Sequence, residues 1–154
     1  WDDVANHILD VILKVEWEVP VAIKFHTTMN RKKYKTRIPK NFKVVSGPLS
    51  LLLPKTLIAI GNSTGALIEA ASHGIPSIDI QCNEKFSHNY MPETGRGILW
   101  GSAGNADEVK MLVEKYKFAL QESPERIKEE AKKMLSFCFS EPKDELISRA
   151  FELD

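Results

Sequence analysis

A run of small and hydroxylated residues is the first feature of this sequence that could do chemistry. Gly61-Asn-Ser-Thr-Gly65 follows the apolar run 57–60 and leads directly into the helical pattern 64–72. Small residues let backbone N–H groups approach a ligand, and a helix N-terminus carries about half a positive charge. These features predict an anion site, most naturally for phosphate or pyrophosphate, and plain helix capping by Asn62 or Ser63 is the alternative. The candidate ligands are Asn62, Ser63, Thr64 and Gly65.

A carboxylate follows one helical turn later. Glu69 lies in an otherwise apolar stretch, 66–71, and its oxygens can accept hydrogen bonds from a ribose diol while the helix N-terminus holds the phosphates. The alternative is a solvated helix residue. The flanking alanines favour the ribose interpretation, because they predict close packing in which an unsatisfied carboxylate costs free energy.

A second polar group follows the apolar run 21–25. An imidazole and two hydroxyls at a strand end can bind phosphate oxygens, with the histidine donating as an imidazolium. The candidate residues are His26, Thr27 and Thr28, with Lys24 as an electrostatic helper. We favour anion binding over a structural role for His26, because it lies in a long stretch without carboxylates.

The zero net charge hides a strong segregation of charge. The chain has 21 basic and 21 acidic residues, yet residues 19–68 hold nine lysines and arginines and no acidic residue. Such asymmetry predicts an anionic partner over this region. The alternative is that residues 31–40 form a solvated basic loop paired with acidic helices elsewhere. The balanced total excludes a protein whose whole surface binds nucleic acid or acidic lipid.

Apolar periodicity predicts the elements that must position these groups. Helices are expected at 2–14, 49–53, 64–72 and 142–151, with two more beginning at Asn105 and Ser123. Strands are expected at the short apolar runs 21–25, 42–45, 57–60, 77–80 and 97–100. Alternating helices and continuously apolar strands predict an α/β fold, a Rossmann-like parallel sheet sandwiched by helices. Ligands bind such sheets outside the carboxyl ends of the strands, where both candidate groups fall.

Length and composition predict one domain over 1–154, with residues 123–154 as C-terminal helices. No apolar run reaches the roughly 18 residues of a membrane span, and the N-terminus has no signal-peptide pattern. Two cysteines fit a reducing compartment, so a cytoplasmic location is expected. The histidines and cysteines show no zinc-ligand spacing, and no metal is predicted. The start at Trp1, inside a helical pattern, suggests a piece of a longer protein.

The segment Ile60–Pro76 resembles the nucleotide-binding segment in the C-terminal half of GT-B glycosyltransferases. It is equally similar to that of the related non-hydrolysing UDP-N-acetylglucosamine 2-epimerases, whose pattern Asp-Ser-Gly-Gly-Ile-Gln-Glu-Glu-Ala aligns without gaps with Asn62–Ala70. This resemblance implies Ser63 and Gly65 at the donor phosphates and Glu69 on the ribose hydroxyls.

Ile23-Lys-Phe-His-Thr-Thr28 resembles the Lys-x-His-Pro-Thr-Thr element of surface-polysaccharide transferases, with Thr27 in place of the proline. Bacterial sialyltransferases and Kdo transferases carry related His-Pro and Ser-Ser/Thr elements that contact a CMP donor. Asn89–Glu93 followed by Gly97–Trp100 is similar to a loop near the donor in the surface-polysaccharide group.

The resemblance implies the donor-binding domain of a glycosyltransferase for bacterial surface or capsular polysaccharide. Its substrate would be a UDP- or CMP-linked sugar, with no separate cofactor. The acceptor domain and the first strand of the sheet would precede Trp1, so the 154 residues alone are expected to be inactive and the catalytic residues stay unassigned. Peripheral contact with the inner face of a membrane is a further expectation.

Three alternatives stay open. The first two are an epimerase-like domain and a CMP-sugar (sialyl or Kdo) transferase domain. The third is a non-enzymatic basic module that docks on anionic lipid or glycan. Nucleic acid is not expected as a partner, because no RNA-binding motif accompanies the basic stretch.

Overall fold

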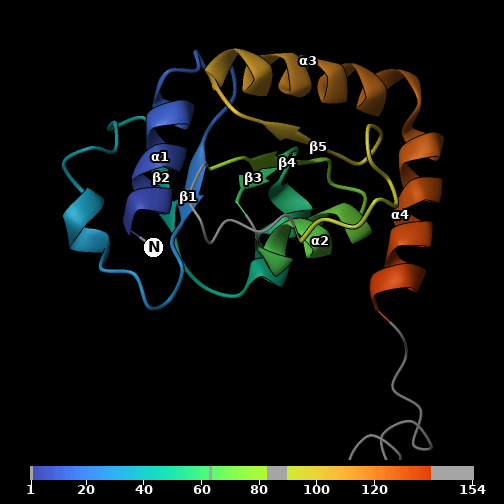
Figure 1. Ribbon diagram of the computed structural model, residues 1–154, viewed down its shortest axis with the longest axis horizontal. Helices are drawn as coiled ribbons and strands as arrows, with labels where there is room; N and C mark the ends of the chain where they lie inside the picture. Colours follow the sequence, from blue (N-terminus) through green and yellow to red (C-terminus); the bar gives the residue numbers. More distant parts are fainter. Residues whose placement is uncertain (1, 63, 83–89, 140–154) are drawn as a thin grey trace, which may run out of the picture.

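The computed structural model describes residues 2–62, 64–82 and 90–139, which form a mixed α/β fold with parallel strands (Figure 1). In chain order its helices and strands are α1 (Asp2–Leu13), β1 (Ala22–Lys24), β2 (Lys43–Val45), β3 (Ala59–Gly61), α2 (Gly65–Ser72), β4 (Ser77–Ile80), β5 (Trp100–Ala103), α3 (Ala106–Glu122) and α4 (Pro124–Cys138). Short 3-10 helices occupy Arg31–Tyr34, Leu49–Leu51 and Leu53–Lys55.

The described strands form two parallel sheets. In the smaller sheet β1 pairs with β2, placing Ile23 opposite Val44. The larger sheet has the order β3-β4-β5, with Ile60 opposite Ile78 and Ile78 opposite Gly101. Parallel strands flanked by helices confirm the coarse fold class predicted from the sequence.

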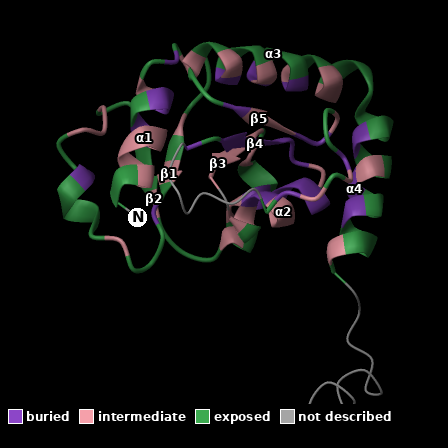
Figure 2. Cartoon of the chain, in the orientation of Figure 1, coloured by how far each residue is buried: buried purple, intermediate pink, exposed green. Residues whose placement is uncertain are grey.

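Helices cover both faces of the larger sheet (Figure 1). On one face α1 and α3 pack on β4 through Ile12, Val109 and Tyr116, which surround Ile78 and Ile80. On the other face α2 and α4 enclose a cluster that includes Leu67, Leu99, Trp100, Ile127 and Met134. Strand β4 is buried along its whole length, as a central strand covered on both faces must be (Figure 2).

The predicted fifth strand is displaced along the chain. The sequence predicts 97–100, whereas β5 begins at Trp100 and ends at Ala103. Gly95 and Gly97 adopt positive φ values of 76° and 79°, and the Gly97 N–H donates to the Trp100 carbonyl at 2.8 Å. These two glycines therefore form a turn where the apolar pattern predicts strand, since such backbone angles suit glycine.

Helix ends follow the predictions in part. Asn105 caps α3, accepting from the Glu108 N–H at 3.0 Å, and Gly74 ends α2 with φ of 78°. Ser123 precedes α4 as predicted, but its side chain makes no capping hydrogen bond. The helix predicted at 49–53 is replaced by two 3-10 turns, because Pro54 has no N–H with which to continue an α-helix. The helix predicted at 142–151 lies outside the described residues.

Within the described part of the chain, every helix is too short or too polar to cross a bilayer.

Candidate functional site

The connection from β3 to α2 contains the first predicted anion site. Thr64 is the N-cap of α2, and its Oγ1 accepts from the Ala66 N–H at 3.3 Å. The Asn62 side chain bonds to the neighbouring strand instead. Its Nδ2 donates to the Ile80 carbonyl at 2.6 Å, which links the end of β3 to the end of β4. Gly65 is exposed, and a Cβ built on it would meet nothing within 4 Å. The first turn of α2 thus has open space beside it, while Ser63 lies outside the described residues.

Glu69 lies one turn further along α2 and is half-buried. Its backbone carbonyl is 2.8 Å from the Nδ1 atom of His73. Its carboxylate has no hydrogen-bond partner among the described residues, so both oxygens are available to a ligand or to water. The partial exposure lowers the desolvation cost that the alanine-rich sequence predicts for this carboxylate.

The second predicted site follows β1 and is exposed to solvent. The Thr28 N–H donates to Nδ1 of His26 at 3.4 Å, and Oγ1 of Thr28 lies 2.8 Å from the same atom. Thr28 thus occupies Nδ1, and Nε2 is the ring nitrogen left to contact a ligand. Thr27 is exposed beside it.

A cavity of about 540 Å³ lies between β1 and β3. Lys24 and His26 line it from the β1 side, and Gly61 lines it from the β3 side. The cavity therefore borders two residues of the second predicted group and the glycine that precedes the first group, and it has the volume of a small-molecule site. The predicted residues Thr27, Thr28, Asn62, Thr64, Gly65 and Glu69 are not among its lining residues.

Asp79 is a buried acidic residue that the sequence reasoning missed. Its side chain is 1% exposed, and in the sheet it lies opposite Gly61 on one side and Ser102 on the other. Nε2 of Gln81 donates to its carboxylate at 2.5 Å. A carboxylate is rarely buried to this extent without partners. An acidic residue inside the apolar run 77–80 was therefore the sequence signal that could have indicated a buried polar group.

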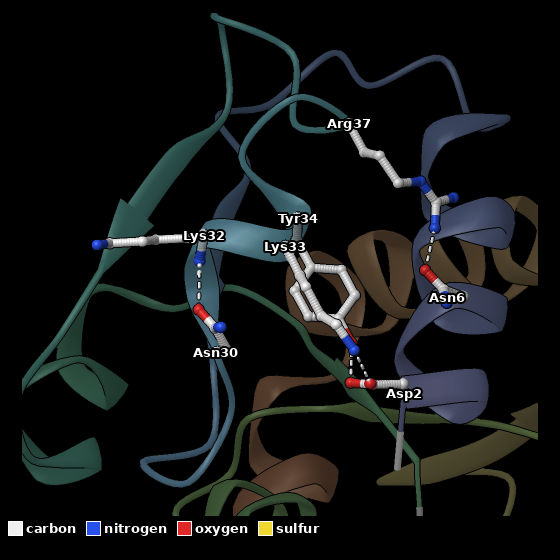
Figure 3. A network of polar contacts seen from close by, with 7 residues as sticks. All are labelled: Asp2, Asn6, Asn30, Lys32, Lys33, Tyr34 and Arg37. Carbon is white, nitrogen blue, oxygen red and sulfur yellow. Dashed lines mark hydrogen bonds and ion pairs between the residues drawn. The ribbon is translucent and has the colours of Figure 1, made fainter.

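The basic loop is partly paired with α1 (Figure 3). The Lys33 ammonium forms an ion pair with Asp2, which also accepts from the Tyr34 hydroxyl at 2.6 Å. Arg37 donates to Asn6 and pairs with Asp10. For Lys33 and Arg37 the structure supports the alternative prediction, a basic loop paired with an acidic helix. Lys32 points away from α1 in Figure 3.

These contacts shift two pKa values. The Lys33 ammonium, and after it the Tyr34 hydroxyl, hold the pKa of the Asp2 carboxyl below its usual value. The hydrogen bond to Asp2, helped by burial, raises the pKa of Tyr34 to about 12. Tyr34 is only 2% exposed and stacks on Phe25, with ring centroids 5.4 Å apart. The start of α1 is thereby fixed to the segment that follows β1.

No protein-family model, curated protein or solved structure matches this chain. Fold and site together define a class, a mixed α/β protein of parallel strands with polar groups after two of its strands.

Proposed function

We propose that this chain is the nucleotide-sugar donor-binding domain of a GT-B glycosyltransferase that builds bacterial surface or capsular polysaccharide. One observation carries the proposal: the first turn of α2 is open, with Gly65 exposed, and the half-buried Glu69 lies one turn further along the same helix. Gly61, at the end of β3, lines the same cavity as Lys24 and His26. The donor is a UDP- or CMP-linked sugar. The domain works in the cytoplasm and makes peripheral contact with the membrane.

In this proposal the donor phosphates lie at the first turn of α2. Gly65 is exposed, and its backbone N–H and the dipole of the helix favour an anion there. Nε2 of His26 and the Lys24 ammonium approach from the β1 side, and Glu69 accepts hydrogen bonds from the ribose hydroxyls. These groups stabilise the negative charge that develops on the leaving nucleotide as the glycosidic bond breaks.

The acceptor and the catalytic base belong to a further domain of the same polypeptide in this proposal. The chain of 154 residues therefore binds nucleotide without turning over nucleotide sugar. A basic docking module is less favoured, because Lys33 and Arg37 already pair with α1.

A titration with UDP, CMP and GDP, followed by amide NMR shifts, tests the proposal. We expect shifts at residues 24–28 and 61–69. Glu69→Gln is expected to remove a preference of about tenfold for UDP over its 2′-deoxy analogue, because a hydrogen bond to a charged group contributes about 1.5 kcal/mol. Glu122→Gln, a change at an exposed position near the end of α3, is the matched control and keeps the preference.

Absence of shifts with all three nucleotides at millimolar concentration would refute the nucleotide site. Retention of the ribose preference in Glu69→Gln would refute the role of Glu69 while leaving the phosphate site standing.

A further inference from the structure

One side of the 3-10 helix Arg31–Tyr34 is fixed to the rest of the molecule. The Tyr34 ring is buried and stacks on Phe25, and the Tyr34 hydroxyl donates to Asp2 at 2.6 Å. The Lys33 ammonium pairs with the same carboxylate (Figure 3). These contacts hold the segment beside the amino end of α1 and set the direction in which its other side chains leave the backbone.

The other cations of this segment point elsewhere. Arg31, Lys32 and Lys35 are exposed, and none of them forms an ion pair with a described residue. Residues three apart in a 3-10 helix eclipse one another, and the Lys35 N–H donates to the Lys32 carbonyl at 3.4 Å. Figure 3 shows Lys32 pointing away from α1. The segment therefore carries an outer basic face, which we define as Lys32 and Lys35 with the neighbouring Arg31.

The carboxylates that reach this segment are already paired. Asp2 pairs with Lys33, and Asp10 pairs with Arg37. Residues 19–68 contain no acidic side chain that could serve the outer basic face instead. Like charges three residues apart repel one another, and a bound anion relieves that repulsion. The fold thus leaves a cationic surface whose charge an anionic partner would compensate.

A polymer fits the outer basic face better than a single small anion. An exposed ion pair contributes little by itself, because water screens it. Several contacts reinforce one another when the anions belong to one chain, since the first contact raises the effective concentration of the next anion. Lys32 and Lys35 lie three residues apart at a rise of about 2.0 Å per residue, so each can contact a different group of such a chain.

The surrounding aromatic and apolar side chains indicate which polymer is favoured. Single-stranded nucleic acids bind on exposed aromatic rings, on which their bases stack. Tyr34 and Phe25 are both buried and stack on each other. A lipid surface takes up apolar side chains, whereas Met29 and Ile38 pack inward on the cluster that contains Tyr34. A hydrated acidic polysaccharide requires neither feature, because exposed cations are sufficient to bind its anionic groups.

The outer basic face adjoins the cavity between β1 and β3. Phe25 follows β1 directly and stacks on Tyr34, so the end of β1 lies beside the 3-10 helix. The sequence neighbours of Phe25, Lys24 and His26, line the cavity. A sugar chain that leaves a donor site at this cavity can therefore reach the outer basic face.

We propose that the outer basic face binds an acidic polysaccharide, a sugar polymer that carries carboxylate or phosphate groups. In the glycosyltransferase proposed above, this polymer is the growing product, held at a distance from its reacting end. The inference rests on that proposed function and adds the charge of the polymer to it.

The test measures the binding of oligogalacturonate, a carboxylated sugar polymer, to the whole chain of 154 residues by amide NMR shifts at several salt concentrations. We expect shifts at Arg31, Lys32 and Lys35. The affinity is expected to fall as the salt concentration rises, because salt screens exposed ion pairs. Dextran, a neutral sugar polymer, is the control ligand and is expected to cause no shifts.

Single substitutions separate the outer basic face from the net charge of the segment. Lys32→Gln is expected to weaken binding by about threefold, and Lys32→Gln combined with Lys35→Gln by about tenfold. Lys33→Gln removes the same charge from the same segment, but from a side chain that already pairs with Asp2, and it is expected to leave the affinity nearly unchanged. Equal losses in Lys32→Gln and Lys33→Gln would overturn the proposal, because net charge alone would then explain the binding.

Other polyanions complete the experiment. Absence of binding to oligogalacturonate at low salt would overturn the proposal. Tighter binding to vesicles of phosphatidylcholine and phosphatidylserine, or to oligothymidylate, with the same loss in Lys32→Gln, would overturn it in favour of a lipid or a nucleic acid. Binding of oligogalacturonate without any shift on addition of nucleotides would refute the nucleotide site and still support the outer basic face.

Discussion

Tyr34 and Asp2 are the residues whose chemistry the fold alters most directly. A buried hydroxyl that donates to a carboxylate is held in its neutral form, which raises the pKa of Tyr34 from 10.0 to about 12. Because the folded pKa is raised, this contribution to stability is complete below pH 10 and is lost as pH rises through 12. Burial also raises the pKa of Tyr116, well beyond its usual range.

Asp2→Asn is therefore expected to lower the pKa of Tyr34 toward its ordinary value. The measurement is the absorbance of tyrosinate across an alkaline titration. Asp3→Asn is the matched control, since Asp3 contributes the smallest of the named effects on Tyr34. A titration of Tyr34 that is the same in Asp2→Asn as in the unaltered chain would show that burial alone raises its pKa.

The amino ends of α3 and α4 differ in side-chain capping. Asn105 caps α3 by accepting from the Glu108 N–H, and the Glu108 carboxylate accepts from the Gly104 N–H at 2.7 Å and from Nδ2 of Asn105 at 2.8 Å. We expect Asn105→Ala to lower the free energy of unfolding by about 1 kcal/mol. The matched change Ser123→Ala, at the uncapped start of α4, is expected to be close to neutral.

Urea unfolding of both variants measures the difference. Equal losses would mean that Ser123 caps α4 in solution and that the sequence prediction was right at both helices.

The sequence predicted those helices and strands that local residue patterns determine. The runs 21–25, 42–45 and 77–80 each contain an observed strand, and the run 57–60 overlaps β3, because short branched apolar runs suit a buried parallel strand. The sequence did not predict contacts between residues that lie far apart in the chain. The pairing of Arg37 with Asp10 joins residues 27 apart, and the burial of Asp79 depends on which strands lie beside β4. Both depend on tertiary packing, and the local periodicity of the sequence carries no information about which distant residues pack together.

In the candidate site, too, local features were predicted from the sequence and long-range contacts were not. The sequence placed polar groups after two strands, but the two groups share a cavity only through Lys24, His26 and Gly61. The sequence offered helix capping by Asn62 or Ser63 as the alternative to an anion site, whereas Thr64 is the cap and Asn62 bonds to the Ile80 carbonyl. Small polar residues compete for the same backbone donors, so their roles depend on the tertiary position of the neighbouring strand.

At the scale of the whole molecule the two sheets differ in burial. The residues of β1 and β2 are exposed or half-exposed, whereas β4 is buried throughout (Figure 2). Phe25 and Tyr34 pack with Leu9 in a small cluster of their own beside α1. Few buried apolar contacts mean a low free energy of local opening. We therefore expect the β1–β2 unit to open more readily than the β3–β4–β5 sheet.

Native-state hydrogen exchange tests this expectation with two substitutions. Leu9→Ala removes a buried side chain from the small cluster, at a cost of about 2–5 kcal/mol, and should speed exchange at Ile23 and Val45 while leaving Ile78 nearly unchanged. Ile127→Ala, in the cluster between α2 and α4, should lower protection at Ile78. Equal losses at Ile23 and Ile78 in both variants would show one cooperative unit. Loss of protection confined to one sheet in each variant would instead show that the β1–β2 unit and the β3–β4–β5 sheet open independently.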